Sequence, residues 1–374
     1  MTLLQLVLDE FKAFFRNPSV VFVVIGGVVI YSLLYPLPYA EELPREQKVL
    51  VVDNDNSALS RELIRMVDAT PQVNVIGNAV SHSEAAQAVV DRKAEGIIEI
   101  PRNFYRDVSL GKSPVIAIAG DASYFLVYGT VLEGAMGASG TLGASVKVSR
   151  DVVHGEPIEM AKQQYSAIRL NLKPVFNPTT GYVNYVVPAV FVLILHQTLL
   201  IGVGLSCFTQ RSKGYEKTRL WKKMAAKYLV FGVIYLVAVL YYFGLSFHWY
   251  GVSTLAIPGQ LWLVAVPYLA AVISLGLVIG VLLPRAELVT FTVLISSIPL
   301  VFSAGFIWPV EMIPGAINAL VAMVPSTPGI QAFLRMNQMG DSFVQVSPLV
   351  GQLCLQALLY GAIAFVLLKR TSTE

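Results

Sequence analysis

Long apolar runs alternate with polar segments along this chain of 374 residues. A helix must supply about 20 apolar residues to cross a hydrocarbon core of about 30 Å. Segments of about that length lie at residues 20–37, 182–207, 226–247, 261–283, 288–307 and 348–368. The pattern predicts an α-helical polytopic membrane protein with six transmembrane helices, the first of them within residues 18–37.

A seventh apolar stretch, residues 123–146, has a different composition. It contains Glu133 and four glycines, at positions 134, 137, 140 and 143. A charged residue at the centre of a membrane helix costs about 2.5–3.5 kcal/mol on insertion scales. We therefore expect a helix whose small-residue face packs closely inside a water-soluble domain.

Residues 1–17 have an amphipathic pattern. Apolar residues recur at three- and four-residue spacing from Leu3 to Phe15, interrupted by Glu10, and Asn17-Pro18 ends the pattern. This predicts a cytoplasmic helix that lies in the membrane interface. The pattern leaves open whether the helix is only a topological anchor or a lever that transmits cytoplasmic motion to the first span.

The polar segment 38–178 alternates between two periodicities. Strand patterns fall at 48–53, 73–76, 96–100 and 115–119, and helical patterns at 58–67, 83–93, 124–153 and 158–170. The alternation predicts an inserted α/β domain. Asp53, Asn54 and Asp55 lack the remaining ligands of a calcium loop, so we expect a helix-capping turn there.

Charge gives the predicted spans an orientation. Only 14% of the residues are charged, 55% are hydrophobic and the net charge is +3, which excludes disorder and disfavours nucleic acid as a partner. Basic residues gather on one side of the spans, the cytoplasmic side by the positive-inside rule. Both termini are then cytoplasmic, and residues 38–178 are extracytoplasmic, as in a bacterial inner membrane. The bases include Lys12, Arg16, Arg211, Lys213, Lys217, Arg219, Lys222, Lys223, Arg285, Lys369 and Arg370.

Patterns for covalent chemistry are absent from the sequence. It has no phosphate-binding G-x-x-x-x-G-K-[ST], no H-E-x-x-H and no G-x-S-x-G. Its two cysteines and four histidines do not have metal-ligand spacing. We therefore expect no catalytic residue, cofactor or metal. The predicted spans carry no charged residue near their centres, which disfavours ion-coupled transport, so an energy source would lie on another chain.

Two polar features interrupt the second half of the chain. The loop 208–224 mixes bases with aromatic and acidic residues, which suits docking of a cytoplasmic partner, although the bases would also fix topology without one. The residues concerned are Arg211, Lys213, Gly214, Tyr215, Glu216 and Trp221. Further on, Pro309, Pro314, Pro325 and Pro328 break an apolar stretch. Backbone at membrane depth must be hydrogen-bonded internally, so we predict a re-entrant segment at about 307–340.

The second of these features resembles a known family. Gly305, Pro309, Glu311, Met312, Pro314 and Pro325 are similar to the proline-rich signature of type-2 permeases of ATP-binding-cassette (ABC) exporters. Asn177-Pro178, before the second span, resembles the start of that span in the family. The stretches 51–69 and 96–111 resemble the subgroup with a large extracytoplasmic domain after the first span. In the loop, Tyr215 stands where the family usually has threonine.

The resemblance implies the membrane permease of an ABC exporter. Such a chain forms the translocation pathway as a homo- or heterodimer and is driven by a separate ATPase subunit. The resemblance also suggests a periplasmic adaptor protein, an outer-membrane channel and membrane lipid as partners, with amphipathic drugs or lipid-like compounds as cargo. Inside the spans, His196, Gln197, Ser296 and Ser297 are expected to hydrogen-bond between helices or to line the pathway.

Two hypotheses from other classes stand beside the permease. The first is a membrane-anchored receptor or scaffold whose extracytoplasmic domain binds an envelope component without transport. The second is an intramembrane hydrolase, which would need an embedded nucleophile and base that the spans do not supply. Association with an ATPase distinguishes the permease from both.

Overall fold

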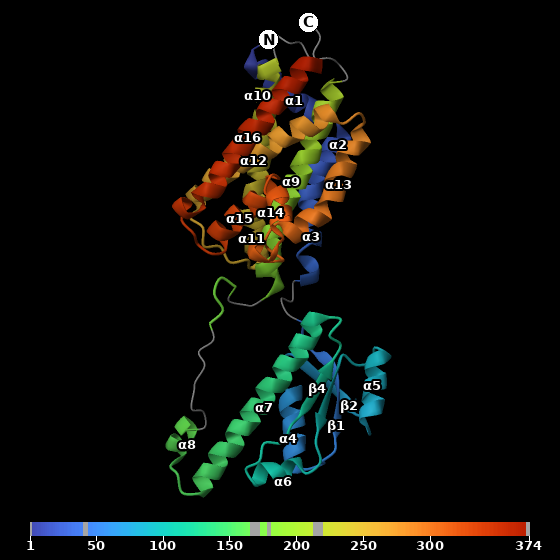
Figure 1. Cartoon of the computed structure of the whole chain (residues 1–374), viewed down its shortest axis with the longest axis vertical. Coiled ribbons are helices and arrows are strands. Elements are labelled where there is room, and N and C mark those ends of the chain that lie inside the picture. Colours follow the sequence, from blue (N-terminus) through green and yellow to red (C-terminus); the bar gives the residue numbers. More distant parts are fainter. Residues whose placement is uncertain (1, 40–43, 165–172, 178–180, 212–219, 372–374) are drawn as a thin grey trace. The chain divides into compact units, whose positions relative to one another are not determined.

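The computed structural model describes the chain except residues 1, 40–43, 165–172, 178–180, 212–219 and 372–374. It divides into two compact units. One, here called the membrane unit, comprises Met1–Glu42 and Pro174–Glu374. The other, the sheet unit, comprises Leu43–Lys173. Each is described separately below (Figure 1).

The membrane unit contains the predicted spans. Within the described residues, six helical segments are long and apolar enough to cross a membrane, which confirms the polytopic helical fold. The first span, Pro18–Tyr39, joins α2 (Pro18–Val21), a π-helical turn (Phe22–Gly27), α3 (Val28–Leu34) and a 3₁₀ turn (Leu37–Tyr39). The others are α9 (Tyr182–Arg211), Leu220–Tyr250 with α10 (Leu220–Leu240) and α11 (Phe247–Tyr250), α12 (Pro258–Leu282), α13 (Ala286–Ser303) and α16 (Phe343–Thr371).

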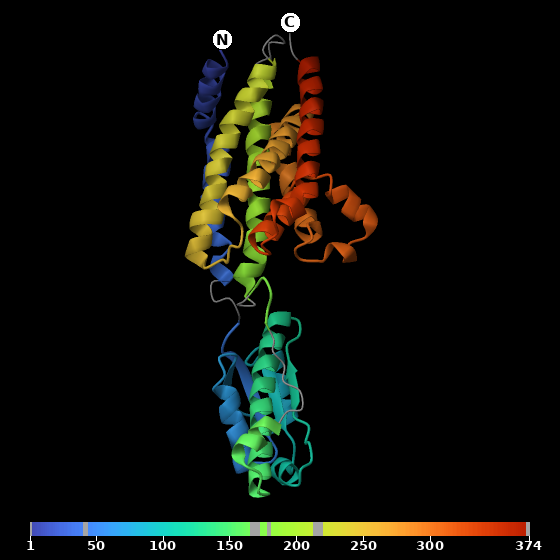
Figure 2. The same ribbon diagram turned by 90° about the vertical axis from the view of Figure 1, so that its left-hand side faces the viewer.

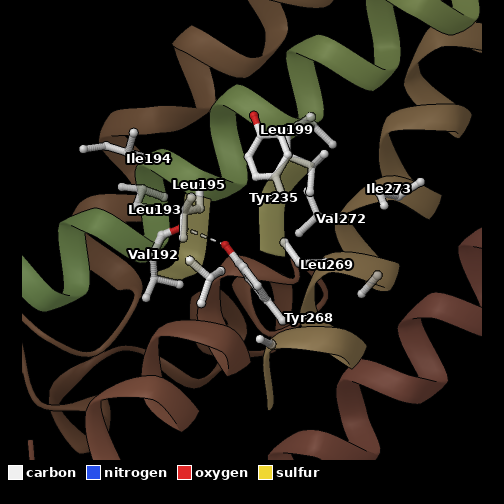
Figure 3. Close-up of a cluster of buried hydrophobic side chains, with 14 of the residues drawn as sticks. Val192, Leu193, Ile194, Leu195, Leu199, Tyr235, Tyr268, Leu269, Val272 and Ile273 are labelled. Atoms are coloured by element: carbon white, nitrogen blue, oxygen red, sulfur yellow. Dashed lines mark hydrogen bonds between the residues drawn. The ribbon is translucent and has the colours of Figure 1, made fainter. Parts of the chain in front are cut away.

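Helix α9 forms the centre of this unit. It is buried along almost its whole length and packs against α12, α13 and α15 (Ser326–Asn337). Glycines permit the close approach of α9 and α12, because a Cβ on Gly280 of α12 would lie 2.5 Å from the carbonyl oxygen of Gly204 in α9. Figure 3 shows the core between α9 and α12, where the Tyr268 hydroxyl donates to the Val192 carbonyl at 2.7 Å. The spans therefore pack as one hydrophobic core.

Helix α16 runs along α12 (Figure 1), and α1 (Leu3–Phe15) runs along α10 (Figure 2). The start of α1 and the end of α16 lie at the same end of the membrane unit, together with the end of α9 and the start of α10. The residues on either side of positions 212–219 are therefore near α1.

The sheet unit is built on four strands in the order β2-β1-β3-β4. β1 (Gln47–Asp53), β2 (Val73–Asn78) and β3 (Gly96–Ile100) are parallel, and β4 (Ala117–Gly120) is antiparallel to β3. Alternate strand residues face opposite sides of a sheet. Val51 and Ile98 accordingly join a core with α4 (Ala58–Asp68) and α7 (Phe125–Val153), and Val52 and Ile97 pack against α5 (His82–Val90).

Two further helices belong to this unit. The predicted helix from residue 158 is α8 (Ile158–Gln164), and the rest of the predicted range, 165–170, lies outside the described residues. The sequence pattern did not predict α6 (Phe104–Ser109). It is a single short turn preceded by Asn103 at φ +62°, and so few residues do not establish a helical period.

Helix α7 corrects one expectation about packing. The helix is not one of the six segments that are apolar enough to cross a membrane, as expected from Glu133 and its glycines. Of its four cited glycines, however, only Gly134 packs closely, because a Cβ there would lie 2.8 Å from Val73. A Cβ on Gly137, Gly140 or Gly143 would meet nothing within 4 Å. The buried face instead comprises Val131, Ala135, Ala138 and Leu142.

The acidic turn after β1 is a capping turn, as its sequence predicted. The Asp53 carboxylate accepts from the backbone of Asp55 at 3.0 Å and of Asn56 at 2.9 Å, and from the Ser60 hydroxyl at 2.7 Å. Ser57 caps α4 by accepting from the Ser60 backbone. The Asp53 carboxylate is therefore used in the hydrogen bonds that hold this turn.

Candidate functional site

The amphipathic helix α1 is packed onto the ends of two spans. Its first turn is closed by a capping box, in which the Thr2 hydroxyl accepts from the Gln5 backbone and the Gln5 side chain accepts from the Thr2 backbone. Leu6 and Phe14 are buried, and Phe14 meets Phe231 of α10 edge-on at a centroid distance of 5.7 Å. Part of the apolar stripe thus contacts protein, whereas Phe11 and Phe15 remain exposed. Asn17 caps the following helix α2.

A buried ion pair holds this contact together. The Glu10 carboxylate, which interrupts the apolar stripe, lies 2.7 Å from the Lys227 ammonium of α10. The two side chains are 7% and 1% exposed. Removing one partner of such a pair leaves an uncompensated buried charge. Glu10 and Lys227 therefore fix the position of α1 against α10.

The network continues onto α9. The Ser206 hydroxyl donates to Glu10 at 2.9 Å and accepts from Lys227 at 2.7 Å, and the Gln210 amide donates to Glu10 at 2.6 Å. Desolvation alone would raise the pKa of the Glu10 carboxyl, but the Lys227 charge and the hydrogen bonds from Gln210, Lys227 and Ser206 lower it below the ordinary 4.5. Glu10 is therefore the ionised centre of a junction between α1, α9 and α10.

The sequence prediction missed Lys227. It placed the start of the third span at residue 226, with Lys227 at the edge of that span, and considered only charges near the centres of the spans. The observed helix starts at Leu220, and Lys227 is buried. Two signals point to the pair: Glu10 stands alone on an apolar face, and Lys227 lies beyond Lys222 and Lys223, next to the long apolar run of its helix. Only the fold brings together residues 217 positions apart.

A hollow of about 570 Å³ lies beside this junction. The outward residues of α1, among them Asp9, Lys12 and Arg16, line it together with Thr209 and Gln210 from the end of α9. The polar face of α1 therefore borders the start of the predicted docking loop.

The structure describes two of the six residues predicted for docking. Arg211 ends α9, and its guanidinium donates to the carbonyl of Val281 at the end of α12. Trp221, at the start of α10, is 58% exposed, with the Lys222 ammonium 5.6 Å from its ring centroid. Lys213, Gly214, Tyr215 and Glu216 lie outside the described residues.

The predicted re-entrant segment is a bent helix pair. α14 (Gly315–Val321) and α15 meet at an angle of 90°. Pro314 and Pro325 stand at the N-caps of α14 and α15, Pro309 stands at the N-cap of a 3₁₀ turn, and Glu311 is exposed within that turn. Gly305 has φ +86°, and a Cβ there would lie 2.6 Å from Val310. This backbone needs glycine.

Polar side chains of α16 satisfy the backbone at the bend. The amides of Gln352 and Gln356 donate to the Ala322 carbonyl at 2.7 and 2.8 Å, and the Tyr360 hydroxyl donates to the Met323 carbonyl at 2.6 Å. These three residues recur every four positions, so they share one face of α16. They meet the requirement that helix breaks in a membrane be satisfied internally. The sequence prediction missed them, although their spacing in an apolar span is a usable signal.

The four polar residues predicted inside spans divide into two groups. The Gln197 amide of α9 donates to the Ser297 hydroxyl of α13 at 2.8 Å, and the adjacent Ser296 donates to the Val293 carbonyl. His196 points elsewhere: it is 1% exposed, and within the described part of the chain its ring nitrogens have no hydrogen-bond partner. Gln197 and Ser297 are thus joined at the half-buried α9–α13 contact, away from His196.

The described residues contain no group of three or more His, Cys, Asp or Glu side chains that could hold a metal ion. A sequence profile of the ABC-2 family transporter proteins matches residues 18–366. No curated protein sequence matches the chain.

Proposed function

The chain belongs to the ABC-2 transporter family, and on that premise we propose that it is an exporter permease driven by a separate ATPase subunit. Family membership identifies a membrane component of an ABC transporter and implies an ABC ATPase partner. The proposal adds the direction of transport, the docking surface and the path by which motion reaches the spans.

The observation that carries the proposal is the junction at Glu10 and Lys227. It fastens the amphipathic helix α1 to α9 and α10, which are the two spans that flank the loop 212–219. Closure of an ATPase docked at this loop would move the ends of α9 and α10. Because the buried ion pair joins them to α1, the three helices would move together. In this mechanism α1 is a lever as well as an anchor.

The docking surface would include Arg211 and the exposed Trp221, with Lys213, Gly214, Tyr215 and Glu216 between them in sequence. Arg211 would pass the displacement of α9 on to α12, because its guanidinium donates a hydrogen bond to the end of α12. Exposed aromatic residues near bases are common at protein interfaces. Both chain termini and the loop 208–224 would lie in the cytoplasm, as the distribution of basic residues predicts.

A second permease chain, identical or related, would pack on α13. This helix exposes Phe291, Leu294, Ile295, Ile298 and Phe302. The pathway would pass near the α9–α13 contact, with Gln197, Ser296 and Ser297 as its polar residues. His196, buried away from this contact, would have a packing role. The re-entrant segment, including Gly305, Pro309, Glu311, Pro314 and Pro325, would close the outer end.

The sheet unit would be extracytoplasmic, in the periplasm of a bacterium, and would dock an adaptor protein that leads to an outer-membrane channel. Amphipathic drugs or lipid-like compounds suit a pathway that opens to the membrane between two helical subunits. The chain itself would perform no covalent chemistry.

Docking of the ATPase provides the test of this function. An ABC ATPase subunit from the same cells should co-purify with the chain in mild detergent, and Trp221→Ala should weaken that association at least tenfold. Trp249→Ala is the matched control, because Trp249 is 59% exposed in α11, within the same span. Absence of any associated ATPase, or equal loss in both variants, would contradict the proposal.

A further inference from the structure

A pocket in the sheet unit has no part in the coupling mechanism. Its volume is about 340 Å³, within the usual range of about 300–1,000 Å³ for small-molecule sites. Helix α7 forms one wall, and α6 with the segment that follows it forms another. The floor is apolar and comprises Leu63, Phe104, Val108, Ile116, Leu142 and Val146.

The rim of the pocket is basic. Lys112 from the segment after α6, and Lys147 and Arg150 from α7, line it, and the described lining residues include no carboxylate. Two of these cations have loose ion-pair partners outside the lining, with Asp107 3.8 Å from Lys112 and Asp151 4.0 Å from Arg150, on side chains that are partly exposed to solvent. Lys147 also donates to the Gln164 carbonyl at 3.3 Å. Three cations thus face an opening above an apolar floor.

The small residues of α7 keep this opening wide. Ser139 and Gly143 line the pocket, and a Cβ on Gly143 would meet nothing within 4 Å. Gly143 lies in the middle of a 29-residue helix, where glycine lowers stability by about 1 kcal/mol relative to alanine. The glycine is therefore unfavourable for the helix and is not needed for packing. Its effect is to leave space above Leu142 and Val146.

We propose that this pocket binds a single-chain amphipathic anion. The apolar chain would lie on Leu63, Phe104 and Leu142, and its carboxylate or phosphate headgroup would pair with Lys147 and Arg150. The apolar floor requires the ligand's hydrocarbon chain, and the basic rim requires its anionic headgroup. A small inorganic anion would leave the floor uncovered, and a cationic amphiphile would be repelled by the rim. A neutral amphiphile would lack charge-assisted hydrogen bonds.

Photolabelling of the full-length chain in lipid nanodiscs tests this assignment. A diazirine-bearing decanoate is the probe, and labelled peptides are identified by mass spectrometry. We expect labelling within residues 104–116 and 139–150. Decanoate and decyl phosphate should compete at concentrations at least tenfold lower than decanol, which is about the factor contributed by one charge-assisted hydrogen bond. Decyltrimethylammonium and inorganic phosphate should not compete.

Two variants of the pocket, each with a matched control, test whether the labelling depends on this site. Gly143→Leu should fill the pocket and reduce its labelling at least tenfold, whereas Gly140→Leu, also unhindered but outside the pocket lining, should leave it unchanged. Lys147→Gln with Arg150→Gln should reduce labelling to the same extent, whereas the exposed Arg61→Gln should not. Labelling confined to the spans, equal effects of the two leucine variants, or competition by the cationic amphiphile would overturn the proposal.

Discussion

The Lys227 ammonium lies 2.7 Å from the Glu10 carboxylate, and both side chains are buried. This contact joins the amphipathic N-terminal helix to a transmembrane helix more than two hundred residues away in sequence. Because the ion pair links α1 to α10, we expect these two helices to move together.

Breaking this pair should destabilise the membrane unit. Lys227→Met leaves Glu10 buried without its cation, and Glu10→Leu leaves Lys227 without its anion, so each should cost about 3–5 kcal/mol. Glu10→Leu combined with Lys227→Met removes both charges and should recover most of that loss. Thermal unfolding in detergent measures the series, with the exposed Lys369→Met as control. Strictly additive losses in the double variant would show that the pair is not coupled.

The same pair predicts a specific dependence on pH. The folded-state pKa of Glu10 is below the ordinary 4.5, so its ionised form stabilises the fold. That contribution is complete above about pH 4.5 and is lost as the pH falls through the lower folded pKa. The difference in unfolding temperature between wild type and Glu10→Gln should therefore be constant at neutral pH and shrink in acid. A difference that grew on acidification would contradict this sign.

The hydrogen bonds at the bend between α14 and α15 predict non-additive losses. Gln352 and Gln356 both donate to the Ala322 carbonyl, so either single replacement by leucine leaves one donor and should cost about 1 kcal/mol. The double replacement leaves the carbonyl unsatisfied and should cost more than the sum of the singles. Proteolysis at residues 305–325 in vesicles reports opening of the bend. Additive effects would mean that the bend does not depend on these amides.

Cysteine accessibility tests the orientation of the chain. In a Cys354→Ser background, a cysteine at Val90, which is 73% exposed in the sheet unit, should react with an impermeant maleimide added outside spheroplasts. A cysteine at Trp221 should react only after the membrane is permeabilised. Reaction of the Val90 cysteine from the cytosolic side alone would reverse the topology.

The spans and strands could be predicted because each depends on a local pattern. A window of apolar residues found all six spans, and a short apolar run ended by Pro101 placed β3 at its observed bounds, Gly96–Ile100. The site could be predicted less well because its contacts join distant residues. Glu10 was noticed as an interruption of an apolar face, but its partner Lys227 is identified only by the packing of α1 on α10. The close packing expected of the α7 glycines was wrong for Gly137, Gly140 and Gly143, because composition does not specify which face of a helix is buried.

Transport in proteoliposomes tests whether this chain is an exporter permease driven by a separate ATPase. The purified chain is reconstituted with and without its ATPase, and an amphipathic fluorescent dye is added on the side that carries the docking loop. Dye should accumulate inside the vesicles only when the chain, the ATPase and ATP are all present, and Trp221→Ala should reduce the rate at least tenfold. Accumulation driven by the chain alone, or none beyond that of ATPase-free vesicles, would contradict that function.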